Sequence, residues 1–170
     1  MSDTGPKALR TARLVLRPLA ARDVDALHPI LTSTSVRRFL FDGETVSRDF
    51  LAAAIDASIR NFADRGWGLF GITLEDDVPQ GLCGFHMVGT PAERQLVYAL
   101  APAIWGQGLG GEAVGAVVKH ALDVCGMKSI VAAVDAPNTA SIAILRRLGF
   151  EPEVRLVERG RDVIRHVLRG

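Results

Sequence analysis

The chain has too few cysteines and histidines to be organised by a disulfide framework or a structural zinc site. It contains 2 cysteines and 4 histidines in 170 residues, and the histidines are scattered. Cys83 and Cys125 both lie in apolar patterns. We therefore expect buried free thiols and no bound metal.

An excess of charge of one sign and long apolar runs are also lacking. The 20 basic residues nearly balance the 19 acidic ones, so charge gives no reason to expect nucleic acid or an anionic membrane as a partner. No apolar run approaches the length of a membrane span, and residues 1–7 lack the apolar segment of a signal peptide. We therefore expect a cytoplasmic protein.

The most informative segment that is present is a glycine-rich stretch, residues 102–112 (PAIWGQGLGGE). Apolar residues then recur with helical spacing over residues 114–125, and Gly126 marks the end of the predicted helix. A glycine-rich loop before a helix presents free backbone N–H groups and the positive end of the helix dipole, which together favour a bound phosphate. The residues predicted to bind it are Gly106, Gln107, Gly108, Leu109, Gly110 and Gly111.

Residues 106–111 also match the G-x-G-x-x-G motif of dinucleotide-binding proteins. A strand-like run at 129–134 and then Asp135 follow the helix, as in such proteins. However, Pro102 and Trp105 separate the preceding strand from the glycines, and too little chain follows for a doubly wound sheet. A nicotinamide-dependent oxidoreductase is therefore the less favoured alternative.

Four segments, in this order, resemble the Gcn5-related N-acetyltransferase (GNAT) superfamily, and in particular its RimJ/RimL-like branch. They are residues 11–19 (TARLVLRPL), the glycine loop with Trp105 and residues 111–113, Asn138 with Ser141, and residues 147–150 (RLGF). Two positions depart from the superfamily pattern. Trp105 replaces the usual Gln or Arg beside the cofactor, and Leu145 stands where a tyrosine often acts as general acid. The RimJ/RimL-like branch commonly carries both substitutions.

The pattern of apolar residues and turns predicts an α/β or α+β fold with a mixed sheet. The expected order is β-α-α-β-β-β-α-β-α-β-β, with helices after the caps Asp23 and Ser47, after the glycine loop and at 139–148. The expected strands are 14–19, 67–74, 80–88, 94–100, 129–134, 153–158 and 162–168. The resemblance implies a single GNAT-like domain over residues 1–170, with a twisted mixed sheet and helices on both faces. Residues 1–10 are expected to form a flexible tail.

The resemblance further implies acetyl-CoA as cosubstrate and gives roles to several residues. The diphosphate would lie on the N–H groups of the glycine loop. The pantetheine arm would pair with the strand that holds Tyr98, Ala99 and Leu100, where an N–H near Leu100 faces the thioester oxygen. Asn138 either caps the following helix or binds the pantetheine amide. Ser141 either belongs to that cap or donates to the leaving thiolate.

The sequence identifies no general base with certainty. Related enzymes often carry a Glu three residues before the tyrosine, but Gln95 has that place here, and Glu93 lies near a strand edge. The ordinary pKa of a histidine makes His86 a candidate base near neutrality. The alternative is a structural histidine whose hydrogen bonds are made in or beside the core. Asp42 and Glu44, between the first two helices, are expected to attract a cationic amine rather than to deprotonate it.

The sequence therefore predicts an acetyl-CoA-dependent N-acetyltransferase that acetylates a primary amine directly, preferably the α-amine of a protein or peptide N-terminus. Neither cysteine resembles an activated nucleophile, so no acetyl-enzyme is expected. A small-molecule acceptor (an amino acid, a polyamine or an antibiotic) and a non-catalytic acyl-CoA-binding protein remain alternatives. No nucleic acid or membrane partner is expected, and the protein is expected to be a monomer or a homodimer.

Overall fold

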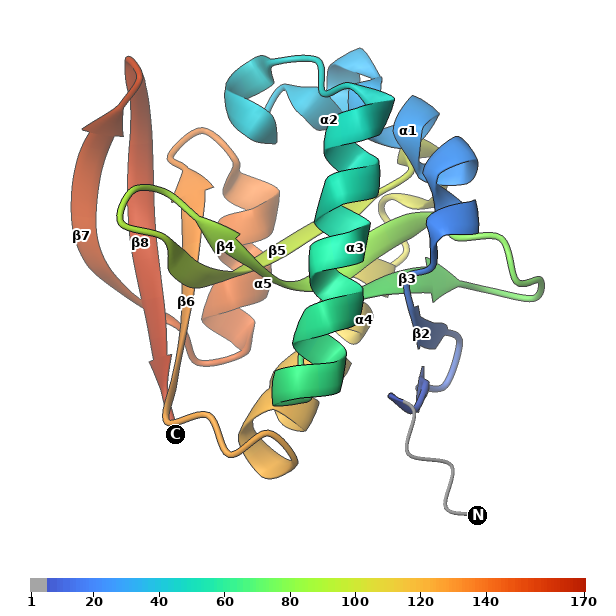
Figure 1. Ribbon diagram of the computed structural model, residues 1–170. Helices are drawn as coiled ribbons and strands as arrows, with labels where there is room; N and C mark the ends of the chain where they lie inside the picture. The colour runs from blue at the N-terminus through green and yellow to red at the C-terminus, as the bar shows by residue number, and fades with distance from the viewer. Residues whose placement is uncertain (1–5) are drawn as a thin grey trace.

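The computed structural model of the chain describes residues 6–170, which form two antiparallel sheets that lie side by side (Figure 1). The first sheet follows the order of the chain: β1 (Leu9–Arg10), β2 (Val15–Pro18), β3 (Leu69–Thr73), β4 (Gly81–Val88) and β5 (Glu93–Leu100). The second has the order β6 (Ser129–Asp135), β8 (Arg161–Arg169) and β7 (Glu151–Glu158). β5 and β6 are neighbouring edges of different sheets.

Helices cover both faces of the larger sheet (Figure 1). Their bounds are α1 (Val24–Thr32), α2 (Thr34–Arg37), α3 (Arg48–Arg65), α4 (Leu109–Asp123) and α5 (Thr139–Arg147), with short 3-10 helices η1 (Ala21–Asp23), η2 (Phe41–Gly43) and η3 (Pro102–Ile104). Buried residues of α1 and α2, with Leu51 and Ile55 of α3, pack on one face. Those of α4 and α5 pack on the other face, where Phe62 from the end of α3 joins them. The predicted α/β fold class and the order of the main elements are therefore confirmed. In place of the expected mixed sheet, the described strands form two antiparallel sheets, and a short helix, α2, is added to the predicted elements.

Strand alternation divides the buried residues between these two faces. On β4, Leu82 belongs to the core under α1–α3, whereas Cys83 belongs to the core under α4 and α5. On β5, Ala99 and Leu100 divide in the same way. Because Tyr98 has the parity of Leu100, its side chain points to the face that α4 and α5 cover.

The N-terminal half differs from the prediction in two places. Leu9 and Arg10 were expected in a flexible tail, which is wrong, because they pair with Leu16 and Val15 as β1; residues 1–5 of that tail lie outside the described residues. Asp23 does not cap α1 with its side chain. Its carboxylate instead accepts the N–H of residue 20 at 2.8 Å, because the chain first forms the turn η1.

Other local predictions are confirmed. Ser47 caps α3 by accepting the Phe50 N–H at 3.0 Å, and Gly66 ends that helix with φ 77°. The hairpin between β7 and β8 turns at Arg159 and Gly160, which have φ 49° and 76°. Positive φ at both central positions matches the right-handed twist of the hairpin strands.

The dinucleotide-binding alternative is wrong. It requires the strands on either side of the glycine loop to lie parallel in one sheet. Here β5 pairs antiparallel with β4, and β6 pairs antiparallel with β8 in the other sheet. The glycine motif therefore sits at a gap between two sheets.

Candidate active site

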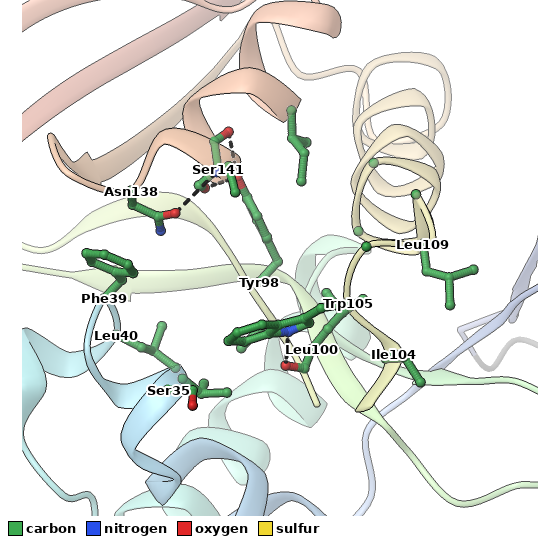
Figure 2. Close-up of a pocket in the computed structure, with 18 of the residues that line it drawn as sticks. Ser35, Phe39, Leu40, Tyr98, Leu100, Ile104, Trp105, Leu109, Asn138 and Ser141 are labelled. Carbon is green, nitrogen blue, oxygen red and sulfur yellow. Dashed lines mark hydrogen bonds between the residues drawn. The ribbon is translucent and has the colours of Figure 1, made fainter. Parts of the chain in front are cut away.

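A cavity of about 820 Å³ lies where the end of β5 meets α2 and the N-termini of α4 and α5 (Figure 2). Most residues that the sequence assigned to the cofactor line this cavity: Tyr98, Ala99, Leu100, Trp105, Gly106, Gly108, Leu109, Gly110, Gly111, Asn138 and Ser141. Gln107 and His86 do not line it. The structure thus brings together three segments between Tyr98 and Ser141 that are separate in the sequence.

The glycines of the loop do different things. Gly106 and Gly108 have φ 73° and 76°, a left-handed conformation that side chains rarely adopt, and Gly108 directly precedes α4. Gly110 is different, since a Cβ there would meet Ile144 of α5 at 3.2 Å. A Cβ on Gly111 would meet nothing within 4 Å. Gly110 therefore permits the close contact between α4 and α5.

An ion pair that sequence reasoning missed holds the loop in place. The carboxylate of Glu112, in the first turn of α4, accepts the Arg13 main-chain N–H at 2.9 Å and its Nε–H at 2.7 Å. Arg13 Nη1 also donates to the Gln107 carbonyl at 2.7 Å. Hydrogen bonds from Thr11 and then from Arg13 lower the pKa of Glu112. The only hint in the sequence was an acid in the first helical turn, which also stabilises a helix by itself.

The end of β5 presents an open strand edge to the cavity. The Ala101 N–H donates to the Gln80 carbonyl at 2.7 Å, so residue 101 faces β4. Antiparallel strands alternate in this respect, and the N–H and C=O of Leu100 consequently face the gap beside β6. The Leu100 carbonyl accepts the Trp105 Nε1–H at 2.8 Å, and Pro102 starts η3 and takes the chain away from the sheet. The Leu100 N–H points toward the cavity side of the strand.

Two hydroxyl groups meet at the N-terminus of α5. Asn138 Oδ1 accepts the Ser141 N–H at 3.2 Å, which is the predicted helix cap. The Ser141 side chain forms a hydrogen bond with the Tyr98 hydroxyl instead of contributing to the cap. Burial, the largest influence, raises the pKa of Tyr98 to about 12. Leu145, at the place of the superfamily's tyrosine, is fully buried and offers no hydroxyl.

The candidate bases lie elsewhere. His86 follows Phe85 on β4, opposite Gln95, and burial lowers its pKa. Glu93 accepts Arg165 Nη2 at 2.8 Å, and this pairing lowers the pKa of its carboxyl. In residues 6–170, no aspartate, glutamate or histidine lines the cavity.

Residues 34–40 form the opposite wall of the cavity, where Phe39 and Leu40 lie (Figure 2). Asp42, expected to attract an amine, instead lies 3.3 Å from the Arg159 guanidinium. Neither Asp42 nor Glu44 lines the cavity. Arg38 and Arg147 are the charged residues that do.

The described residues, 6–170, contain no helix long and apolar enough to cross a membrane. Over the same range there is no group of three or more His, Cys, Asp or Glu that could hold a metal ion. A cavity that joins a glycine-rich helix N-terminus to an open strand edge suits transfer of a group from a phosphate-bearing cofactor to a second substrate.

Comparison with known proteins identifies the family. The acetyltransferase (GNAT) domain family matches residues 13–151. The N-acetyltransferase p20 of Bacillus licheniformis is 30% identical over 153 residues, which cover 86% of this chain and 84% of that protein. The chain belongs to the GNAT acetyltransferase family and is an N-acetyltransferase; enzymes of this family use acetyl-CoA.

Solved structures show the same fold. A GNAT-family acetyltransferase from Bordetella pertussis superposes with a TM-score of 0.80 at 21% identity, covering 95% of this chain and 98% of that one. RimL, a ribosomal L7/L12 α-N-protein acetyltransferase solved with coenzyme A, has a TM-score of 0.79 at 20% identity, covering 96% and 98%. The GNAT-like fold that the sequence indicated is thereby confirmed.

Proposed function

We propose that this enzyme transfers the acetyl group of acetyl-CoA directly to the α-amine of a protein or peptide N-terminus. The observation that carries this proposal is the lack of any carboxylate or imidazole among the cavity-lining residues of the described part of the chain. With no base in the cavity, the amine has to arrive neutral. α-Amines have pKa values of about 7.7–8.0, against about 10.4 for lysine.

The cofactor site follows from the backbone. The diphosphate binds the free N–H groups at the start of α4, and Arg13 and Glu112 keep that loop in position. The pantetheine arm adds to the open edge of β5, in the manner of a peptide that extends a sheet. The Leu100 N–H then donates to the thioester oxygen, on which negative charge develops during attack. Asn138 lies at the same end of the cavity and meets the amide groups of the arm.

The reaction needs no covalent enzyme intermediate. The amine nitrogen bonds to the thioester carbon, and the carbon–sulfur bond breaks with its electron pair on sulfur. Water takes the proton that the nitrogen loses. Ser141 donates a hydrogen bond to the leaving thiolate. Burial raises the pKa of the Cys83 thiol, and Cys83 lies in the core, so it supplies no nucleophile.

The opposite wall suits a peptide. Phe39 and Leu40 give it an apolar surface, and Arg38 beside them favours an acceptor without positive side chains close to the amine. The RimL structures support this choice of acceptor, because RimL is an α-N-protein acetyltransferase.

The test compares two peptides of equal length, one with a free N-terminus and no lysine, the other N-blocked with one lysine. Thiol release from acetyl-CoA is measured from pH 6 to pH 10. At pH 7 we expect the α-amine peptide to react faster by about 10²-fold, in line with its larger neutral fraction. Each rate is expected to follow the pKa of its own amine. Faster acetylation of the lysine peptide at neutral pH, or of a free amino acid or polyamine included in parallel, would contradict the proposal.

A further inference from the structure

The hydroxyl groups of Tyr98 and Ser141 come from different elements and meet at one side of the cavity. Tyr98 rises from β5, and its ring reaches the first turn of α5, where its oxygen is hydrogen-bonded to Ser141 Oγ (Figure 2). The same phenol oxygen lies 3.3 Å from the Ser141 carbonyl oxygen. Within residues 6–170, Ser141 Oγ has no other hydrogen-bond partner. Both residues line the cavity.

Either oxygen can donate in this hydrogen bond, and a protonated phenol allows Tyr98 to be the donor. With the pKa of Tyr98 raised to about 12 by burial, the phenol is protonated at all physiological pH values. Its single hydrogen faces two acceptors, Ser141 Oγ and the Ser141 carbonyl, and both belong to the same residue. When Tyr98 donates to Oγ, the serine's own hydrogen is free to point into the cavity.

The rest of Ser141 is already fixed. Its N–H is bound by Asn138 Oδ1, and its side chain is 8% exposed. The main chain of Ser141 is therefore held, and within residues 6–170 Tyr98 is the hydrogen-bond partner that orients its hydroxyl group. A donor to Oγ also polarises the serine O–H and strengthens the hydrogen bond that it makes in turn.

We propose that Tyr98 is a positioning residue that donates to Ser141 Oγ and thereby aims the Ser141 hydroxyl at the sulfur of acetyl-CoA. This inference rests on the proposed function of the cavity. Tyr98 takes the place of the tyrosine that other members of the superfamily carry where this chain has Leu145, but it acts through the serine.

The hydroxyl pair stabilises the thiolate without giving up a proton. Carbon–nitrogen bond formation and carbon–sulfur bond cleavage leave the electron pair on sulfur, and Ser141 donates a hydrogen bond to it. A phenol with a pKa of about 12 is a much weaker acid than an alkyl thiol, at about 8.5, so Tyr98 keeps its proton. Water later protonates the thiolate, and the amine's proton also leaves to water.

The experiment is a double-mutant cycle with Tyr98→Phe, Ser141→Ala and the double variant, assayed by thiol release with acetyl-CoA and the α-amine peptide. Phenylalanine keeps the ring and removes only the hydroxyl. We expect Ser141→Ala to lower kcat by about 10²-fold, as for loss of one donor to developing charge. Tyr98→Phe is expected to lower kcat by about 10-fold, with the Kd of acetyl-CoA within about 2-fold of the wild type.

The double variant distinguishes positioning from a separate role. If Tyr98 acts through Ser141, the double variant is as slow as Ser141→Ala alone. Multiplied effects, or Tyr98→Phe with full kcat, would overturn the inference while wild-type turnover keeps the proposed function. A rise in the Kd of acetyl-CoA at unchanged kcat would also overturn it, since this would show a binding role. If the wild-type protein releases no thiol with the peptide, the proposed function and this inference fall together.

Discussion

The two sides of the cavity are built in different ways. The side proposed to bind the cofactor, residues 98–111 and 138–141, combines a helix start with a strand edge and would act mainly through backbone N–H groups. The side proposed to bind the acceptor, residues 34–40, presents mainly side chains on a short helix and the turn after it. A backbone site needs glycines at fixed places and leaves a readable mark in the sequence. A wall of side chains can be made from many different residues, so no sequence pattern identifies it.

The two sides are also held differently. Arg13 and Glu112 join the chain before β2 to the first turn of α4 on the cofactor side. On the acceptor side, Arg161 at the start of β8 pairs with Asp135 and donates to the Arg38 carbonyl at 2.6 Å. Each side is therefore held by its own ion pair and hydrogen bonds. A substitution can weaken the contacts of one side without touching those of the other.

The largest effect is expected from Gly108→Val. A branched side chain strongly disfavours φ 76°, so the loop should rearrange and lose its aligned N–H groups. We expect the Kd of acetyl-CoA to rise by at least about 100-fold, which removes about 2.3 of the roughly 2.7 kcal/mol by which acetyl-CoA at 100 times the wild-type Kd stabilises the fold. Calorimetric titration and thermal shift with acetyl-CoA measure this change.

The matched control is Gly126→Val. Like Gly108, Gly126 has a positive φ, 65°, and a Cβ there would meet nothing within 4 Å. It lies beyond the other end of α4, away from the glycine loop. The backbone strain is the same in kind, so the melting temperature should fall in both variants. The acetyl-CoA shift should survive only in Gly126→Val. Equal loss of the shift would mean that the loop has no special role in binding the cofactor.

On the acceptor side, Arg161→Met should loosen residues 38–43 without touching the glycine loop. Removing the guanidinium frees the Arg38 carbonyl and leaves Asp135 unpaired. We expect the KM of the peptide to rise by about 10-fold, with the Kd of acetyl-CoA unchanged. Arg155→Met, which breaks the pair with Asp162 within the same hairpin, should leave both constants unchanged. Parallel loss of cofactor affinity in Arg161→Met would show that the two sides are not independent.

Glu112→Gln tests how much the ion pair between Arg13 and Glu112 stabilises the protein, because that contribution depends on pH. The folded-state pKa of Glu112 is depressed, so its contribution is present above the unfolded pKa of about 4.3 and is lost as pH falls through the folded value. We expect the variant to be less stable by about 1 kcal/mol at pH 7, and the difference to vanish at acid pH. Urea unfolding of both proteins between pH 3 and pH 7 measures it. A constant difference over that range would exclude the carboxylate as its cause.

The smallest effect is expected from His86→Ala. His86 does not line the cavity, and burial lowers its pKa, so the ring is neutral near pH 7 and remote from the amine. The pH dependence of kcat/KM should keep its inflection at the pKa of the acceptor amine. Disappearance of the inflection in the variant would establish His86 as the base.

The sequence predicted the glycine loop and the start of α4 well, and the reason is geometric. Gly106, Gly108 and the α4 pattern are local features, and local features determine a helix start and a left-handed turn. The helix caps at Ser47 and Asn138 are equally local. The face of β5 from which Tyr98 projects, and its hydrogen bond with Ser141, were not predicted from the sequence.

Only the tertiary structure decided which segments far apart in the chain contact one another. Arg13 with Glu112, Arg161 with the Arg38 carbonyl, and Tyr98 with Ser141 each join separate elements. The sequence by itself determined the family, the order of elements and the backbone site, because these depend on local conformation and periodicity. The gap between β5 and β6, the absence of a base from the cavity lining in residues 6–170, and the hydroxyl pair arise when two sheets pack on one core.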